Sequence, residues 1–89
     1  MNFENGLIKL NKAGLLSGEE GPLNLDSLTK ASSAGVYPEN FANGLIKLNT
    51  AGLLSGEEGR LNRDSLTQAS SDGVSPENIA NAIIKLNKS

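Results

Sequence analysis

The 89-residue sequence contains neither cysteine nor histidine. These two residue types supply thiolate nucleophiles, disulfide bonds, most transition-metal ligands and the commonest general base. Serine remains as a candidate nucleophile, but the serines fall at expected helix starts and ends, where backbone capping explains them. The sequence therefore predicts a protein that is not an enzyme and that carries no cofactor and no catalytic metal.

Aromatic residues, excess basic charge and long apolar runs are scarce as well. There is no Trp, and the eight basic residues are scattered among ten acidic ones, which gives a net charge of −2. A nucleic-acid footprint or a membrane-surface helix needs clustered Lys and Arg. No apolar run approaches the ~20 residues that span a bilayer, and the first residues lack the pattern of a secretion signal. We therefore expect no nucleic-acid partner, no membrane contact and, by default, the cytoplasm; the compartment is undetermined if the protein is a secreted effector.

An internal repeat dominates what the sequence does contain. Residues 3–40 align with residues 41–78 without a gap and differ at seven of 38 positions, and a partial copy fills residues 79–89. We therefore predict a single helical-repeat domain over residues 1–89, with repeat 1 at 3–40, repeat 2 at 41–78 and a partial repeat at 79–89. Copies this similar point to a recent duplication, or to a designed or trimmed repeat protein.

The first half of each repeat has the pattern of an amphipathic helix. In the second copy Pro38 suits the first helical position, where its missing N–H costs nothing. Phe41, Leu45 and Leu48 follow the i, i+4, i+7 spacing of one buried face. Gly52 is suited to the left-handed position that ends a helix. The pattern thus predicts a long helix from Pro38 to just before Gly52.

The second half of each repeat carries two further helix-start signals. Ser55 and Glu58 have the spacing of a capping box, and the glycine that follows them predicts a helix of a single turn. Asn62 is then expected to be the N-cap of a shorter helix that ends at Gly73. One bent helix across both segments is the alternative. The predicted fold is all-α: two tandem 38-residue units of long helix, one-turn helix and shorter helix, plus a C-terminal closing helix. Such units bury their apolar faces by stacking.

The segment "PENFANGLIKLNTAGLLS" resembles the short α-helical tandem repeats of effector-like proteins from intracellular bacteria, in which runs such as "ALIKLNQAGLLT-PEN" recur. The similarity covers the long helix and its exit, about half of each unit, while the half containing "SGEEGPLNLDSL" departs from that pattern, as does the period. The resemblance implies an α-helical repeat that serves as a scaffold or a protein-binding surface. It brings no catalytic residues with it.

Two acidic clusters leave a ligand-binding alternative open. They consist of Glu19, Glu20 and Asp26 in the first copy and of Glu57, Glu58 and Asp64 in the second. One interpretation is a module that binds Ca²⁺ or a small ligand, or a hydrolase fragment that uses the carboxylates. The spacing does not match an EF-hand loop, and carboxylates near a helix start are also favoured by the helix dipole.

Positions that differ between the copies are candidates for a binding surface. Leu25 is paired with Arg63, and Tyr37 with Ser75. Leu25 and Tyr37 are the predicted partner surface, as an apolar patch suited to a protein or to a second chain; drift between the copies is the alternative. The function that we predict is a non-catalytic structural or protein-interaction helical repeat module, whose partner is another protein or a second copy in a homodimer.

Overall fold

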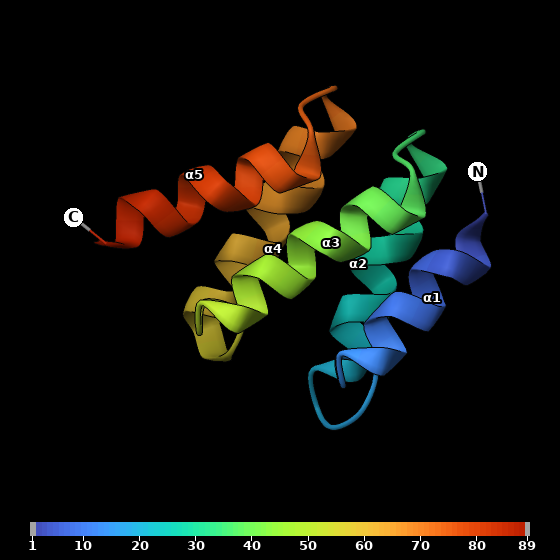
Figure 1. Cartoon of the computed structure of the whole chain (residues 1–89), viewed down its shortest axis with the longest axis horizontal. Helices are drawn as coiled ribbons and strands as arrows, with labels where there is room; N and C mark the ends of the chain where they lie inside the picture. The colour runs from blue at the N-terminus through green and yellow to red at the C-terminus, as the bar shows by residue number, and fades with distance from the viewer. Residues whose placement is uncertain (1, 89) are drawn as a thin grey trace.

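The computed structural model describes residues 2–88, which form five helices and no strand. The helices are α1 (Phe3–Lys12), α2 (Gly21–Ser33), α3 (Pro38–Thr50), α4 (Gly56–Ser71) and α5 (Pro76–Lys88) (Figure 1). The predicted all-α class is therefore confirmed. Within these residues, every helix is too short or too polar to cross a bilayer.

The five helices pack in two layers. In the first layer α3 packs between α1 and α5, and in the second α2 packs against α4. Figure 1 shows α1, α3 and α5 running in the same direction, with α2 and α4 behind them. α3 also contacts both helices of the second layer. The radius of gyration is 11.5 Å, close to the ~12 Å expected of one compact domain of this length.

α3 lies at the centre of the hydrophobic core. Phe41, Leu45 and Leu48 are completely buried, so the predicted apolar face of this helix is confirmed. Burying a side chain of this size contributes about 1.5–3 kcal/mol of transfer free energy. The other completely buried apolar residues come from all four remaining helices and from α3 itself: Leu10, Leu28, Ala31, Ala42, Leu66 and Ala80.

Glycine ends the first four helices in the same way. After α3, Gly52 has φ of 75°, and the Leu53 N–H donates to the Leu48 carbonyl at 2.9 Å. This is a Schellman motif, in which a left-handed residue lets the chain reverse and satisfies the last carbonyls. Gly14, Gly35 and Gly73 also have positive φ and follow α1, α2 and α4. The helix ends predicted at Gly52 and Gly73 are confirmed.

The predicted one-turn helix is wrong in both copies. In the second copy α4 runs without a break from Gly56 through Gly59 to Ser71, so the single-helix alternative holds there. In the first copy residues 17–20 form a turn, and α2 starts at Gly21. The difference follows from Pro22, which stands where the second copy has Arg60: proline has no N–H to donate and its ring clashes with the carbonyl four residues earlier.

Helix lengths and caps in this region also differ from the prediction. Asn62 lies inside α4 and is not an N-cap. Ser55 does occupy the N-cap position, but its side chain accepts no hydrogen bond, so the capping box is not formed. At 16 residues α4 is longer than α3, which has 13, so the expected order of a long and a shorter helix is reversed.

Glycines inside α1 and α3 permit close contact within the first layer. A Cβ atom on Gly6 would lie 2.8 Å from Cβ of Pro38, and one on Gly44 would lie 3.1 Å from the Pro76 carbonyl oxygen. Both glycines therefore face the first residue of the next helix in the layer. The third position in this series is Ala82, which is exposed. Close helix contact thus accounts for glycine at two positions where it lowers helix propensity by about 1 kcal/mol.

We expect the substitution Gly6→Ala to lower the free energy of unfolding by about 1 kcal/mol, because the added methyl group overpacks the contact with Pro38. Helix propensity alone predicts the opposite sign, a gain of about 1 kcal/mol. Urea unfolding followed by far-ultraviolet circular dichroism measures the change. The reverse substitution Ala82→Gly, at the exposed position, should cost only the loss of propensity. A stabilised Gly6→Ala variant would show that the contact is loose.

Candidate functional site

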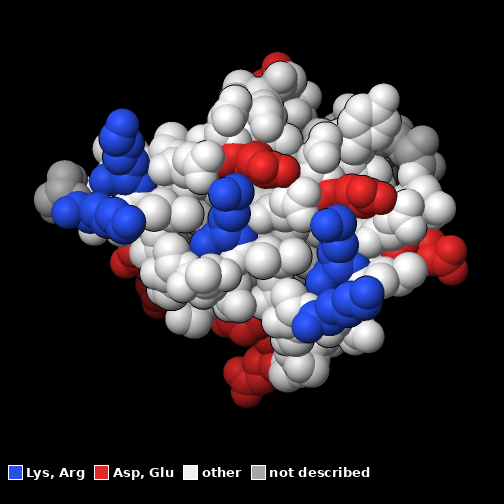
Figure 2. Space-filling view, in the orientation of Figure 1, with Lys and Arg blue, Asp and Glu red and all other residues white. Residues whose placement is uncertain are grey.

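The outer face of the α1, α3 and α5 layer carries both signs of charge. Lys9, Lys47 and Lys85 lie in the last turns of these helices, and Glu39 and Glu77 lie in the first turns of α3 and α5. Figure 2 shows basic side chains spread along this face with acidic side chains beside them. This face therefore presents a surface of mixed charge.

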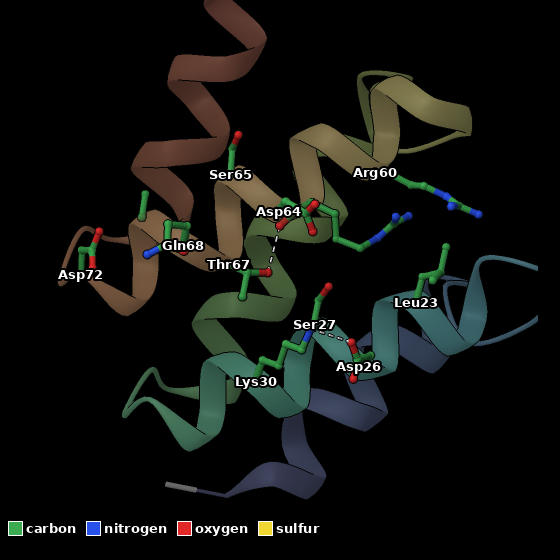
Figure 3. A pocket seen from close by; sticks show the side chains of 12 residues that line it. Leu23, Asp26, Ser27, Lys30, Arg60, Asp64, Ser65, Thr67, Gln68 and Asp72 are labelled. Carbon is green, nitrogen blue, oxygen red and sulfur yellow. Dashed lines mark hydrogen bonds and ion pairs between the residues drawn. The ribbon is translucent and has the colours of Figure 1, made fainter.

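An open groove of about 810 Å³ runs between α2 and α4. Its volume lies in the range of ligand-binding clefts. Figure 3 shows Arg60 and Leu23 at one end and Asp72 at the other. The lining comes from both helices: Leu23, Asp26, Ser27, Lys30, Arg60, Arg63, Asp64, Ser65, Thr67, Gln68, Ala69 and Asp72.

Ten of the twelve lining side chains are polar or charged, and seven of these are exposed: Asp26, Lys30, Arg60, Asp64, Ser65, Gln68 and Asp72. On α2, Lys30 forms an ion pair with Asp26 at 3.2 Å, with both side chains more than 60% exposed. Such an exposed i, i+4 pair contributes little stability. On α4, the Thr67 hydroxyl donates to the Arg63 carbonyl within the helix. Arg60 and Gln68 have no hydrogen bond or ion pair from their side chains within residues 2–88, so they are available to a bound molecule.

Arg63 forms the buried part of the groove. Its side chain is 3% exposed, and its Nε–H donates to Asn24 Oδ1 at 2.8 Å. Its Nη2 donates to Glu20 Oε1 and to the Leu54 carbonyl, both at 3.0 Å. A planar guanidinium suits this arrangement, since its donors point in fixed directions toward several acceptors. Arg63 therefore connects α4 to α2, to the residue that precedes α2 and to the turn before α4.

Asn24 is held in place for this contact. It is 1% exposed, and its Nδ2–H donates to the Leu15 carbonyl at 2.8 Å. The amide nitrogen is thus occupied, and the oxygen points to Arg63. Arg63 was not predicted to be a buried structural residue; its only mark in the sequence is that leucine in the first copy becomes arginine at this position in the second.

The predicted partner residues Leu25 and Tyr37 are exposed but lie at opposite ends of α2. Leu25 is 40% exposed in the second turn of the helix, and Tyr37 is 61% exposed beyond its last residue. About 12 Å of helix rise separates Leu25 from Ser33 alone. Neither lines the groove. Tyr37 instead borders a smaller hollow of about 320 Å³ together with Val74, where the connections α2–α3 and α4–α5 come together.

The carboxylates of the acidic clusters do not converge. Glu20 pairs with Arg63 and Asp26 pairs with Lys30. Asp64 lines the groove, whereas Glu57 and Glu58 do not. Among residues 2–88 no three Asp or Glu side chains are grouped so that they could hold a metal ion together. Glu57, Glu58 and Asp64 therefore do not line the groove together, an arrangement that would have favoured the alternative of a hydrolase fragment.

Comparison of the chain with protein-family models, curated proteins and solved structures finds no match. The function must therefore be inferred from the groove and its residues.

Proposed function

We propose that the protein is a non-catalytic helical repeat module that binds a polar segment of a partner protein in the groove between α2 and α4. In this proposal the chain consists of two stacked 38-residue units, each with one helix in either layer, and α5 closes the first layer. Contacts that recur at a spacing of 38 residues support the stacked arrangement. Gly6 faces Pro38 as Gly44 faces Pro76, and Asn24 is bonded to Leu15 as Asn62 is to Leu53.

The differences between the two copies carry the proposal. The groove uses about a quarter of the positions of the 38-residue unit, yet these include four of the seven positions at which the copies differ. The side chains that these positions contribute are Arg60, Arg63, Lys30, Gln68 and Asp72. Variation on one face of an otherwise constant repeat is what a binding surface requires.

The lining indicates the chemistry of the partner. Lys30 and Arg60 offer cationic donors, Asp64 and Asp72 offer anionic acceptors, and Gln68 offers both. A segment with carboxylate and amide groups along its length can pair with these side chains, while an apolar segment would leave them unpaired. We therefore propose a polar, mixed-charge peptide segment as the ligand.

We expect peptides selected on the full chain from a displayed random library to depend on groove residues. Arg60→Ala and Gln68→Ala should each weaken the selected peptides at least about tenfold, a loss of about 1.4 kcal/mol of binding free energy. Isothermal titration calorimetry with synthetic peptides measures the affinities. Both residues are exposed, so neither substitution should affect folding.

Matched controls come from the other layer. Lys85→Ala and Asn49→Ala also remove exposed polar side chains, from α5 and α3. They should change the affinity by less than about twofold, since they lie outside the groove. Equal losses in the groove and control variants would count against the proposed binding surface, as would selected peptides that bind all four variants as tightly as the original chain.

A further inference from the structure

The pair of acceptors that binds Arg63 occurs a second time in the chain. Glu58 and Asn62 lie 38 residues after Glu20 and Asn24. The Asn62 Nδ2–H donates to the Leu53 carbonyl at 2.7 Å, as Asn24 does to Leu15 at 2.8 Å. Glu20 has helical backbone angles although it precedes α2, so each Glu lies one helical turn before its Asn. The two pairs therefore share one local geometry.

Among residues 2–88, only the first pair has a guanidinium bound to it. Asn24 and Glu20 both accept from Arg63. Within residues 2–88, Asn62 Oδ1 accepts no hydrogen bond, and Glu58 has no ion pair and is exposed. A carboxylate and an amide oxygen held one turn apart are thus presented to solvent in the arrangement that binds arginine elsewhere in the same molecule.

Exposed leucines lie on both helices at this end of the molecule, one of them next to the second pair. Leu61 is 67% exposed on α4, next to Asn62 and one turn from Glu58, whereas Leu23, its counterpart in the first copy, is half-buried at the groove. On α5, Leu86 is 75% exposed, while its counterparts Leu10 and Leu48 are completely buried. The end of the molecule formed by α4 and α5 therefore exposes leucines whose counterparts in the earlier helices are packed against a neighbouring helix pair.

We propose that Glu58, Leu61 and Asn62 form a docking site for an arginine-bearing helix of a partner protein. The partner's arginine donates to Glu58 and Asn62 in the same way as Arg63 donates to Glu20 and Asn24. The helix that carries this arginine covers Leu61. A charge-assisted bond to Glu58 selects arginine over a neutral side chain, and the two acceptors select it over lysine. The inference rests on the stacked units of the proposed function but not on the groove.

A second copy of this chain is a poor occupant for the site. In a second copy, the residue equivalent to Arg63 is Leu25, so the arginine is missing. Glu4 of that copy would also occupy the position at which α3 and α5 have the buried residues Ala42 and Ala80. Burying the Glu4 carboxylate against an apolar surface is costly. The occupant that we propose is a helix of a different protein that has arginine at this place.

The full chain with the double substitution Leu25→Arg and Glu4→Ala provides a probe for the site. Both positions are exposed, so the probe should fold, which circular dichroism checks. We expect the probe to bind the original chain and to shift the amide resonances of Glu58, Leu61 and Asn62 in a ¹⁵N-labelled sample. Replacing Glu58 with Gln in the labelled chain should weaken binding at least about tenfold. The probe carrying Leu25→Lys should also bind at least about tenfold more weakly.

Glu57→Gln is the matched control, because Glu57 is also exposed, lies one residue away and faces another direction on α4. It should leave the affinity for the probe unchanged within about twofold. Absence of resonance shifts at about 1 mM probe would overturn the proposal, as would equal binding to the Glu58→Gln and Glu57→Gln chains. The groove variants Arg60→Ala and Gln68→Ala should bind the probe as tightly as the original chain does. A negative result for the docking site is therefore distinguishable from a negative result for peptide binding in the groove.

Discussion

Truncating Arg63 to alanine should lower the free energy of unfolding by about 3 kcal/mol, near the lower end of the range for breaking a buried ion pair. The truncation removes the donor to Asn24 Oδ1, which is buried and cannot turn to water. It also removes the donor to the Leu54 carbonyl. Glu20 can be rehydrated, since 37% of its side chain is already exposed, and this limits the loss. A domain of this size has only about 4–13 kcal/mol to lose.

Urea unfolding followed at the helical circular dichroism band measures this loss, and two variants separate its causes. Arg63→Lys keeps the charge but cannot reach three acceptors in fixed directions, so it should recover less than half of the stability. The double variant Arg63→Ala with Asn24→Ala should lose less than the sum of the two single losses, because the residues share one bond. A loss below about 1 kcal/mol for Arg63→Ala would mean that the contacts of Arg63 stabilise the protein no more than an exposed salt bridge does.

Helix ends were predictable because their signals are local. To end a helix, Gly52 and Gly73 require only a positive φ angle and a nearby backbone carbonyl that accepts a hydrogen bond, and both conditions are met in the structure. Pro38 is equally local, since its fixed φ and missing N–H suit the first helical position. The boundary of α4 required a comparison between the copies. With Arg60 in place of Pro22, no residue interrupts the helix after Gly56, and Gly59 alone is too weak a signal to stop it.

The groove and the contacts of Arg63 depend on which elements come together, and a single sequence does not specify this. An arginine at a position equivalent to leucine suggests a solvent-exposed residue, because isolated charges are rarely buried. Arg63 is buried because Asn24, Glu20 and Leu54 supply acceptors from three different segments. Asn62 was misassigned as a helix cap for a related reason: its amide bonds to the carbonyl of Leu53 nine residues earlier, which local rules do not consider.

Replacing Gly59 with alanine should destabilise the protein by at least about 2 kcal/mol, even though alanine favours helix by about 1 kcal/mol. Gly59 is buried inside α4, and a Cβ atom there would collide with the backbone of Leu54. Backbone cannot move aside as a flexible side chain can. Gly21 meets the backbone of Leu16 in the same way. Gly21→Ala should therefore show a loss of similar size in the same urea unfolding experiment.

The Gly59→Ala variant also tests how the buried arginine is held. The Leu54 carbonyl that lies against Gly59 is one of the acceptors of Arg63, so displacing it should weaken that hydrogen bond. We therefore expect the double variant Gly59→Ala with Arg63→Ala to lose less stability than the two single losses combined. Gln68→Ala, at an exposed position on the same helix, should change stability by less than about 0.5 kcal/mol and serves as the control. A neutral or stabilising Gly59→Ala substitution would mean that the turn before α4 does not pack against the helix.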